Sequence, residues 1–259
     1  MFLGIDIGTS VIKAALFDEA GHECAERAER MQLLPAPVGW SELDGEAVWK
    51  VTARVVRGLL QQASIAPEAV RGIGVTGVMV GAWLVDEEGR IVRPPILWND
   101  ARALDLVERL RAREPALFSR VFAHSGSMMQ LGCTLPVLAW LKENEPESLS
   151  RAQWVICAKD FIRYRLTGAL ATEESEAAMA PGSAVTRDFI PDQAKLLGIV
   201  ELSRLLAEVR PAEALAGHVT EEAAAATGLA AGTPVAIGTG DTGACALGAG
   251  CHDPGSAVS

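Results

Sequence analysis

Residues 2–18 read FLGIDIGTSVIKAALFD, and this stretch decides the fold. A short apolar run (2–7) stops at Gly8, and a second run rich in apolar and β-branched residues (11–18) follows it. Two such runs separated by a tight, glycine-containing turn predict the antiparallel strands of a β-hairpin. Residues 19–21 (EAG) then turn the chain, and the loose alternation of residues 22–31 predicts a third strand at the edge of the sheet.

The turn of this hairpin, residues 6–10 (DIGTS), carries groups that can surround a phosphate. Gly8 lets the backbone approach an anion closely, and successive N–H groups with the hydroxyls of Thr9 and Ser10 can hold its oxygens. The Asp6 carboxylate can bind Mg²⁺ directly or through water, and Lys13 adds positive charge on the outgoing strand. The alternative is an ordinary tight turn, but its position between the first two strands favours phosphate binding.

The rest of the chain alternates between helix and strand patterns. Apolar residues at Val48, Val51, Val55 and Leu59 recur at helical spacing and predict the buried face of an amphipathic helix. Further strands are predicted at 70–76, 83–85, 96–98 and 234–238, and further helices at 101–113, 135–142 and 220–227. Residues 154–166 are predicted to pass from a strand into a helix, and residues 177–192 to form a long surface loop. Three strands followed by interleaved helices and strands predict an α/β fold with a mixed β-sheet flanked by helices.

Composition excludes several classes of protein. The formal net charge is −10 and no cluster of Lys and Arg appears, so we expect no nucleic-acid partner. The five cysteines are scattered and the four histidines are isolated, which is typical of a reducing cytosol and offers no zinc-site spacing. There is no run of 18 apolar residues and no signal peptide with a basic start. We therefore expect a cytoplasmic protein with no membrane partner.

A second candidate site follows the last predicted strand, at residues 239–243 (TGDTG). An Asp at the carboxyl end of a strand faces the crevice in which α/β proteins bind ligands. Asp241 can accept a proton from an attacking hydroxyl and orient it, the role of the base in phosphoryl transfer. The alternative is an Asx-turn or a helix N-cap.

A third candidate, residues 98–102 (WNDAR), combines an indole, an amide, a carboxylate and a guanidinium. Sugars and polyols need this mixture, because each hydroxyl requires donors and acceptors and the carbon skeleton packs on an aromatic ring. The alternative is that Asn99 or Asp100 caps the helix that follows. Lys159 and Asp160, with Arg163 and Arg165, are interpreted instead as a solvated helix face with ion pairs one turn apart.

Together these segments resemble the FGGY family of carbohydrate kinases, and among them the xylulokinase-type members. The resemblance runs from residue 2 to residue 259. It is carried by residues 4–10 (GIDIGTS), 73–77 (IGVTG) with Met79 and Gly81, 93–102 (RPPILWNDAR), 134–136 (TLP), 159–163 (KDFIR), 166–168 (LTG) and 240–243 (GDTG). Each block alone is weak, but this number of blocks in the right order is strong.

The resemblance implies an actin-like ATPase, ribonuclease H-like fold and ATP-dependent phosphorylation of a ketose or polyol with Mg²⁺. Asp241 matches the catalytic base, and Asp6 and Asp241 match the residues near the metal. The loop that meets the ATP phosphates corresponds to Asp6, Gly8, Thr9, Ser10 and Lys13, and the sugar-binding residues correspond to Met79, Val80, Trp98, Asn99, Asp100, Arg102 and Asp241.

The sequence departs from the family in two ways. Xylulokinase-like members carry His where this chain has Val80, and glycerol kinases carry Arg and Glu at Met79 and Val80, so the resemblance does not assign the sugar. The resemblance also implies an adenine-binding half, which we expect to follow the point at which this sequence ends. We expect residues 1–255 to form the sugar-binding N-terminal domain and 256–259 to begin the missing C-terminal domain, a partner without which kinase activity is negligible. A homodimer is left open.

Two other classes compete with this interpretation. An actin- or chaperone-type ATPase that uses nucleotide to switch conformation shares the phosphate loop but lacks the WNDAR block beside the cleft. A catalytically inactive sugar-binding protein is the other alternative, and the retained Asp241 argues against it only mildly.

Overall fold

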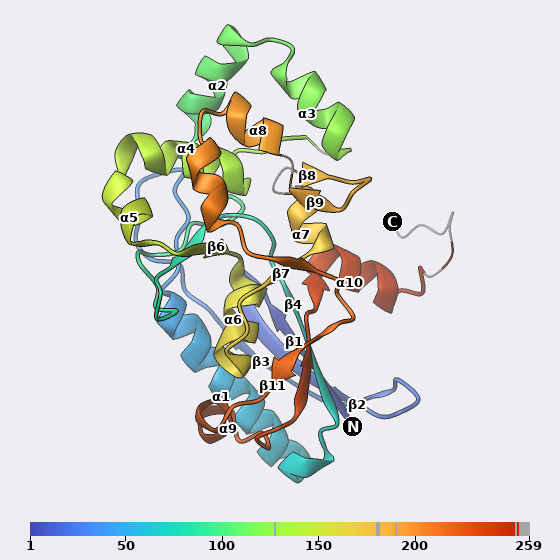
Figure 1. Cartoon of the computed structure of the whole chain (residues 1–259). Coiled ribbons are helices and arrows are strands. Elements are labelled where there is room, and N and C mark those ends of the chain that lie inside the picture. The colour runs from blue at the N-terminus through green and yellow to red at the C-terminus, as the bar shows by residue number, and fades with distance from the viewer. Residues whose placement is uncertain (127, 180–181, 190, 252, 254–259) are drawn as a thin grey trace.

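The computed structural model describes residues 1–126, 128–179, 182–189, 191–251 and 253. A large β-sheet and the helices beside it form the lower part of the molecule in Figure 1, and a cluster of helices forms the upper part. The predicted boundary between residues 255 and 256 lies outside the described residues. None of the described helices is both long and apolar enough to cross a bilayer.

The strands are β1 (Phe2–Ile7), β2 (Val11–Phe17), β3 (Glu23–Arg30), β4 (Gly72–Gly77), β5 (Trp83–Val85), β6 (Trp154–Ile156), β7 (Thr172–Glu173), β8 (Gly182–Ser183), β9 (Asp188–Phe189), β10 (Val209–Arg210), β11 (Leu215–His218), β12 (Pro234–Ala236) and β13 (Thr239–Gly240). The helices are α1 (Gly45–Ala63), α2 (Leu104–Arg113), α3 (Leu117–Ser125), α4 (Thr134–Asn144), α5 (Pro146–Arg151), α6 (Ala158–Thr167), α7 (Glu174–Met179), α8 (Pro191–Leu196), α9 (Glu221–Thr227) and α10 (Asp241–Gly248), with 3₁₀ turns η1 (Pro67–Ala69) and η2 (Val200–Leu205).

The main sheet is mixed, as predicted. Among the described residues it has seven strands in the order β11-β12-β4-β1-β2-β3, and β13 also pairs with β4. The first three strands form antiparallel pairs, whereas β4 lies parallel to β1 on one side and to β12 and β13 on the other. The parallel pairs bring the carboxyl ends of β1, β4 and β13 to one edge of the sheet.

Side-chain alternation gives the sheet two different faces. Leu3, Ile5 and Ile7 of β1 are buried against α1 and α6, whereas Gly4 and Asp6 point to the opposite face. Helix α1 presents the predicted apolar stripe to this core. Its N-cap is Asp44, whose carboxylate accepts hydrogen bonds from the backbone N–H groups of residues 46 and 47. Asp6 therefore lies on the face that α1 does not cover.

A second apolar core lies in the upper part of the molecule, among α2, α4, β6 and η2. Part of this region differs from the sequence-based expectation. Residues 177–192 are not one long loop, because they contain the end of α7, the short hairpin of β8 and β9, and the start of α8. The expectation was wrong because two-residue strands leave no periodic pattern in a sequence.

The interpretation of α6 as a solvated face was also wrong. The side chains of Lys159, Asp160 and Arg163 are completely buried. Asp160 accepts from Lys159 Nζ at 2.9 Å and from Arg163 Nη1 at 2.7 Å, and Glu173 lies 3.3 Å from Lys159. Burial alone would raise the pKa of Asp160, but the charges of Lys159 and Arg163 outweigh it and hold that pKa below its usual range.

We predict that Asp160→Asn destabilises the protein by about 3–5 kcal/mol, because it leaves two buried cations without their shared carboxylate. Urea unfolding of the purified chain measures the loss. Glu143→Gln is the matched control, since it removes an equally close but exposed partner of Arg109 (2.6 Å) and should cost less than about 1 kcal/mol. Equal losses in the two variants would contradict this view of α6.

Candidate functional site

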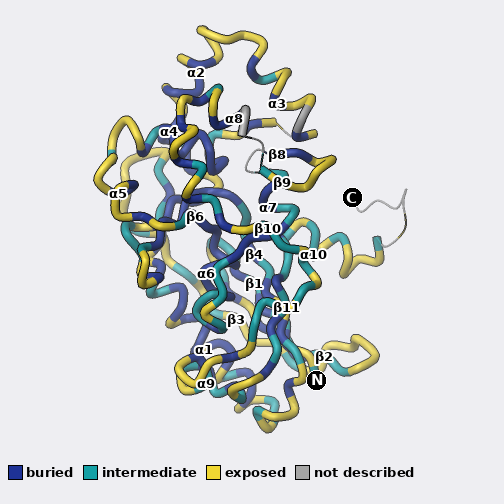
Figure 2. The backbone as a smooth tube through the Cα atoms, in the orientation of Figure 1, coloured by how far each residue is buried: buried dark blue, intermediate teal, exposed yellow. Residues whose placement is uncertain are grey.

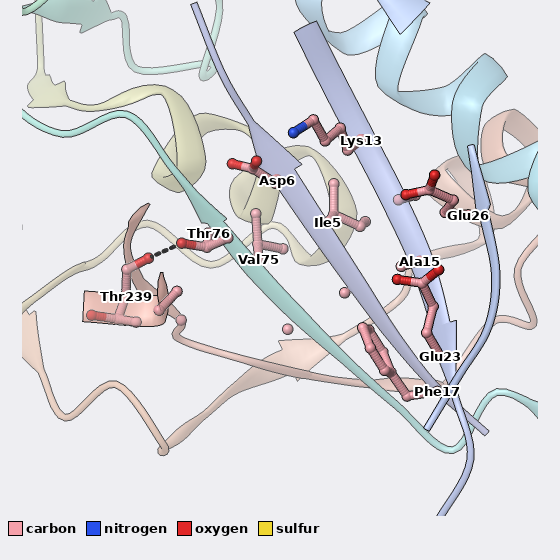
Figure 3. A pocket seen from close by; sticks show the side chains of 15 residues that line it. Ile5, Asp6, Lys13, Ala15, Phe17, Glu23, Glu26, Val75, Thr76 and Thr239 are labelled. Carbon is pink, nitrogen blue, oxygen red and sulfur yellow. Dashed lines mark hydrogen bonds between the residues drawn. The ribbon is translucent and has the colours of Figure 1, made fainter. Parts of the chain in front are cut away.

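The first candidate residue, Asp6, is held near the end of β1 by partners on both sides. It is paired with Lys13 across the antiparallel ladder and with Thr76 across the parallel one. Figure 3 shows the Asp6 carboxylate and the Lys13 ammonium on the same side of the sheet. A carboxylate, a cation and a hydroxyl thus lie next to one another beside the hairpin turn.

The turn itself has the geometry of an anion cradle. The Gly8 N–H donates to Val11 O at 3.0 Å, and a Cβ at Gly8 would lie only 2.7 Å from that oxygen, so this tight bend requires glycine. Within the part of the chain that the structure describes, the backbone N–H groups of Thr9 and Ser10 have no backbone acceptor. These N–H groups and hydroxyls therefore suit phosphate oxygens.

Asp241 reaches the same region from the other end of the sequence. It begins α10 directly after β13, and β13 is parallel to β4 with Thr239 opposite Thr76. The Thr76 hydroxyl donates to Thr239 O at 2.8 Å, the bond drawn in Figure 3. Asp241 is half-buried, and its Oδ1 accepts from the N–H of Thr242 at 2.7 Å.

The negative charge of Asp241 acts on the ionisation of Asp6. Burial raises the pKa of Asp6 above its ordinary value, the charge of Asp241 raises it further, and Lys13 acts in the opposite direction. Two neighbouring carboxylates are ligands that a hard divalent cation prefers. The described residues contain no group of three or more His, Cys, Asp or Glu that could hold a metal ion.

An open pocket of about 490 Å³ extends from Asp6 along the uncovered face of the sheet. Its lining includes the small residues Gly4, Ala15 and Gly74, together with Phe17 and with Ala244 of α10. Lys13, Thr76 and Thr239 line the end near Asp6. The candidate site is therefore the polar end of a larger, mostly apolar surface.

Met79 and Val80 lie in the loop after β4. The Met79 side chain packs so closely on Gly240 that a Cβ there would lie 2.0 Å from its sulfur atom, so Met79 is next to Asp241 in space. Val80 is a buried β-branched residue with φ of 55°, a backbone conformation that costs on the order of 1–3 kcal/mol. Such strain persists only where neighbouring residues hold it.

The structure divides the WNDAR block into two parts. Trp98 is 47% exposed and Asn99 is exposed, and the Trp98 indole N–H donates to the Thr9 hydroxyl at 3.1 Å. This bond joins the block to the hairpin turn. Asp100 and Arg102 have fully buried side chains, unlike the other predicted sugar-binding residues.

Asp100 and Arg102 form the centre of a closed network. Asp100 accepts from the Ser41 N–H at 2.7 Å and from three N–H groups of Arg102 between 2.8 and 2.9 Å. The guanidinium also donates to Glu42 at 2.7 Å and stacks 3.9 Å from the ring centre of Trp40. This geometry suits support of the exposed Trp98 and Asn99 better than direct contact with a ligand.

Sequence reasoning missed three polar residues of the segment 172–176 (TEESE). Glu173 accepts from the N–H of Ser175 at 2.6 Å, and the Ser175 hydroxyl lies 3.3 Å from that of Thr239. Glu176 accepts from the N–H of Val80 at 2.9 and 3.1 Å. The contacts of Glu176 with Val80 and of Ser175 with Thr239 join segments far apart in the chain, so no local sequence pattern indicates them.

Comparisons with known proteins identify the family of this chain. The family model of the N-terminal domain of FGGY carbohydrate kinases matches residues 1–248. A crystal structure of xylulose kinase from Rhodospirillum rubrum superimposes with a TM-score of 0.89 at 29% identity, covering 98% of this chain and 51% of that one. The chain has the actin-like fold of these sugar kinases. It belongs to the FGGY family of carbohydrate kinases.

The curated relatives are also named as sugar or polyol kinases. The chain is 36% identical to xylulose kinase of Escherichia coli (strain K12), covering 100% of this chain and 52% of that one. It is 35% identical to a probable L-xylulose kinase of Pasteurella multocida (97% and 52% covered) and 34% identical to erythritol kinase of Brucella abortus (96% and 48% covered). The chain thus spans about half the length of the curated relatives it matches.

We predict that Asp6→Asn gains stability relative to the parent protein as pH rises from about 3 to about 7. Because the pKa of Asp6 is raised, its ionised form costs stability. This cost is absent below the ordinary pKa of an Asp, grows between the ordinary and the raised value, and is fully present above the raised value. Urea unfolding at several pH values measures the difference in the free energy of unfolding.

Asp18→Asn is the control with the opposite sign. Hydrogen bonds from the backbone and ring of His22 lower the pKa of Asp18, so its ionised form stabilises the hairpin and this variant should lose stability over the same range. If both variants followed the same trend, the electrostatic description of Asp6 would be contradicted.

Proposed function

We propose that the chain is the substrate-binding half of a kinase that transfers the γ-phosphoryl group of ATP to a hydroxyl of a ketose or polyol. The observation that carries this proposal is the convergence of Asp6 and Asp241 beside the Gly8 turn, although they lie at opposite ends of the sequence. A carboxylate base beside a phosphate cradle is the arrangement that in-line phosphoryl transfer requires.

Asp241 is the proposed general base. Its place at the start of α10, with Oδ1 held by the Thr242 N–H, fixes one carboxylate oxygen and leaves the other to accept the proton of the sugar hydroxyl. Asp6 is the proposed carboxylate near Mg²⁺, with Asp241 as the second acidic neighbour. The raised pKa of Asp6 supports this role, because a cation would relieve the repulsion between the two carboxylates.

The hairpin turn is the proposed phosphate contact. Gly8, Thr9 and Ser10 would hold phosphate oxygens through N–H and hydroxyl groups, and Lys13 would add a positive charge. ATP would supply the phosphoryl group and Mg²⁺ would neutralise its developing charge. The hydrogen bond from Trp98 to Thr9 would hold the sugar-binding and phosphate-binding parts of the site in a fixed relative position.

The proposed acceptor site comprises Met79, Val80, Trp98 and Asn99, which border Asp241 or the hairpin turn. We infer that Asp100 and Arg102 act behind them, as the buried support of the indole. The relatives named for xylulose, L-xylulose and erythritol favour an open-chain pentulose or tetritol as the acceptor.

We further propose that a nucleotide-binding domain completes the site. None of the residues of α10 is buried, and Figure 2 shows this helix at the edge of the molecule in teal and yellow. The apolar pocket beside it is equally uncovered. A second domain resting on this surface would hold the adenine of ATP opposite the hairpin turn.

We also propose a cytoplasmic location for the enzyme, because its five cysteines are free.

We predict that a pentulose or tetritol raises the melting temperature of the chain, and that Asp241→Ala reduces the shift by at least half. A thermal-shift panel of D-xylulose, L-xylulose, a hexulose, erythritol and glycerol measures the effect. Glu222→Ala, an exposed carboxylate in the first turn of α9, is the control and should leave the shift unchanged. If no polyhydroxylated compound stabilised the chain, the kinase proposal would lose its main support.

A further inference from the structure

The conformation of the loop after β4 depends on one buried carboxylate. Both oxygens of Glu176 lie within hydrogen-bond distance of the Val80 N–H, at 2.9 and 3.1 Å. Glu176 lies on α7, 96 residues further along the chain, and is 5% exposed. It is therefore a long-range clamp on a single peptide group rather than part of a local turn.

We propose that Glu176 is a positioning residue that fixes Met79 and Val80 in the conformation in which they meet the acceptor sugar. This inference rests on the proposed function, because it takes these two residues as sugar contacts. No role was assigned to Glu176 by the sequence patterns. The clamp acts through the Val80 backbone and needs no contact between Glu176 and the sugar.

Val80 needs such a clamp because its backbone is in a left-handed conformation. Valine at φ of 55° is disfavoured, and its χ1 is restricted by the branched Cβ. A charge-assisted hydrogen bond to the N–H is one of the stronger interactions available to hold it. The next residue, Gly81, is held as well, since its N–H donates to Gly132 O at 2.9 Å. Loss of the Glu176 bond would let the Val80 peptide rotate and carry the Met79 side chain away from Gly240.

The same helix also contacts the strand that directly precedes the proposed base. Ser175, next to Glu176, lies 3.3 Å from the Thr239 hydroxyl, and Thr239 is two residues from Asp241. Glu176 is itself anchored, because its N–H donates to Glu173 at 2.9 Å. Helix α7 thus contacts both edges of the proposed acceptor site, the Val80 loop and the end of β13.

The surroundings of Glu176 make its charge responsive near neutral pH. Burial raises its pKa to about 7, with Lys159 opposing the rise and Asp160 and Glu173 adding to it. The Cys133 and Cys157 thiols are also close to Glu176, and burial raises their pKa values. The opposite charges of Lys159 and Asp160 stabilise each other. Ionisation of Glu176 therefore supplies a readout that a purely structural residue would lack.

The experiment compares four forms of the chain: the parent protein, Glu176→Gln, Glu176→Ala and the control Glu174→Gln. Glu174 is on the same helix, but its carboxylate faces Arg187 at 3.4 Å and not the loop. The amide resonance of Val80 in ¹⁵N-labelled protein reports the clamp without any ligand. Isothermal titration with D-xylulose, L-xylulose and erythritol reports acceptor binding.

We expect the Val80 amide resonance to move with pH around 7 in the parent protein and in Glu174→Gln, and to stay constant in Glu176→Gln. Glu176→Ala should weaken binding of the best acceptor by about tenfold or more, the effect of losing one hydrogen bond to a charged group. Glu176→Gln retains an acceptor oxygen and should bind within about threefold of the parent. Glu174→Gln should bind as the parent does.

Two results would overturn the inference. One is a Val80 amide resonance that changes neither with pH nor with the Glu176 substitutions. The other is parent-like acceptor affinity in Glu176→Ala. If Glu176→Ala does not fold, Glu176→Gln still tests the inference. The positioning role requires that Glu176→Gln remove any pH dependence of acceptor affinity that the parent protein shows around pH 7. Failure of the parent protein to bind any of the three acceptors would instead contradict the proposed function. The amide measurement would still test whether Glu176 holds the Val80 peptide group.

Discussion

The parallel pairing of β4 with β1 on one side and β13 on the other is the constraint on which the rest of the structure depends. It places Thr76 opposite both Asp6 and Thr239, and so brings the two ends of a 259-residue sequence to one edge of the sheet. The antiparallel β1–β2 hairpin then projects its turn beyond that edge. Without this arrangement the candidate phosphate cradle and the candidate base would lie in unrelated places.

The buried charges of α6 and β7 connect the segments that form the second half of the site. Arg163 donates to Ile237 O at 2.8 Å, just before β13, while Asp160 accepts from the Thr172 hydroxyl at 2.8 Å, just before α7. One ionic cluster thus fixes the segment just before Asp241 and the helix that carries Glu176. Burying so many charges is expensive unless each is paired, and the pairing is what ties these distant segments together.

Sequence patterns predicted the mixed sheet, the hairpin, most of the long helices and the family, because apolar periodicity and glycine turns are local properties. They also selected Asp6, Thr9 and Asp241, which the structure brings into one region. They failed for Lys159, Asp160 and Arg163, since a charged helical stretch looks the same whether water or buried partners neutralise it. They could not separate exposed Trp98 from buried Arg102, or find Glu176, because these differences arise from contacts between segments far apart in the chain.

The most direct test of the account is an NMR titration of the Asp6 carboxyl in the parent protein and in Asp241→Asn. The account predicts that the pKa of Asp6 lies above its ordinary value in the parent protein and falls when the neighbouring charge of Asp241 is removed. An Asp6 that titrates at its ordinary value and does not respond to the substitution would contradict the claim that the two carboxylates form one site.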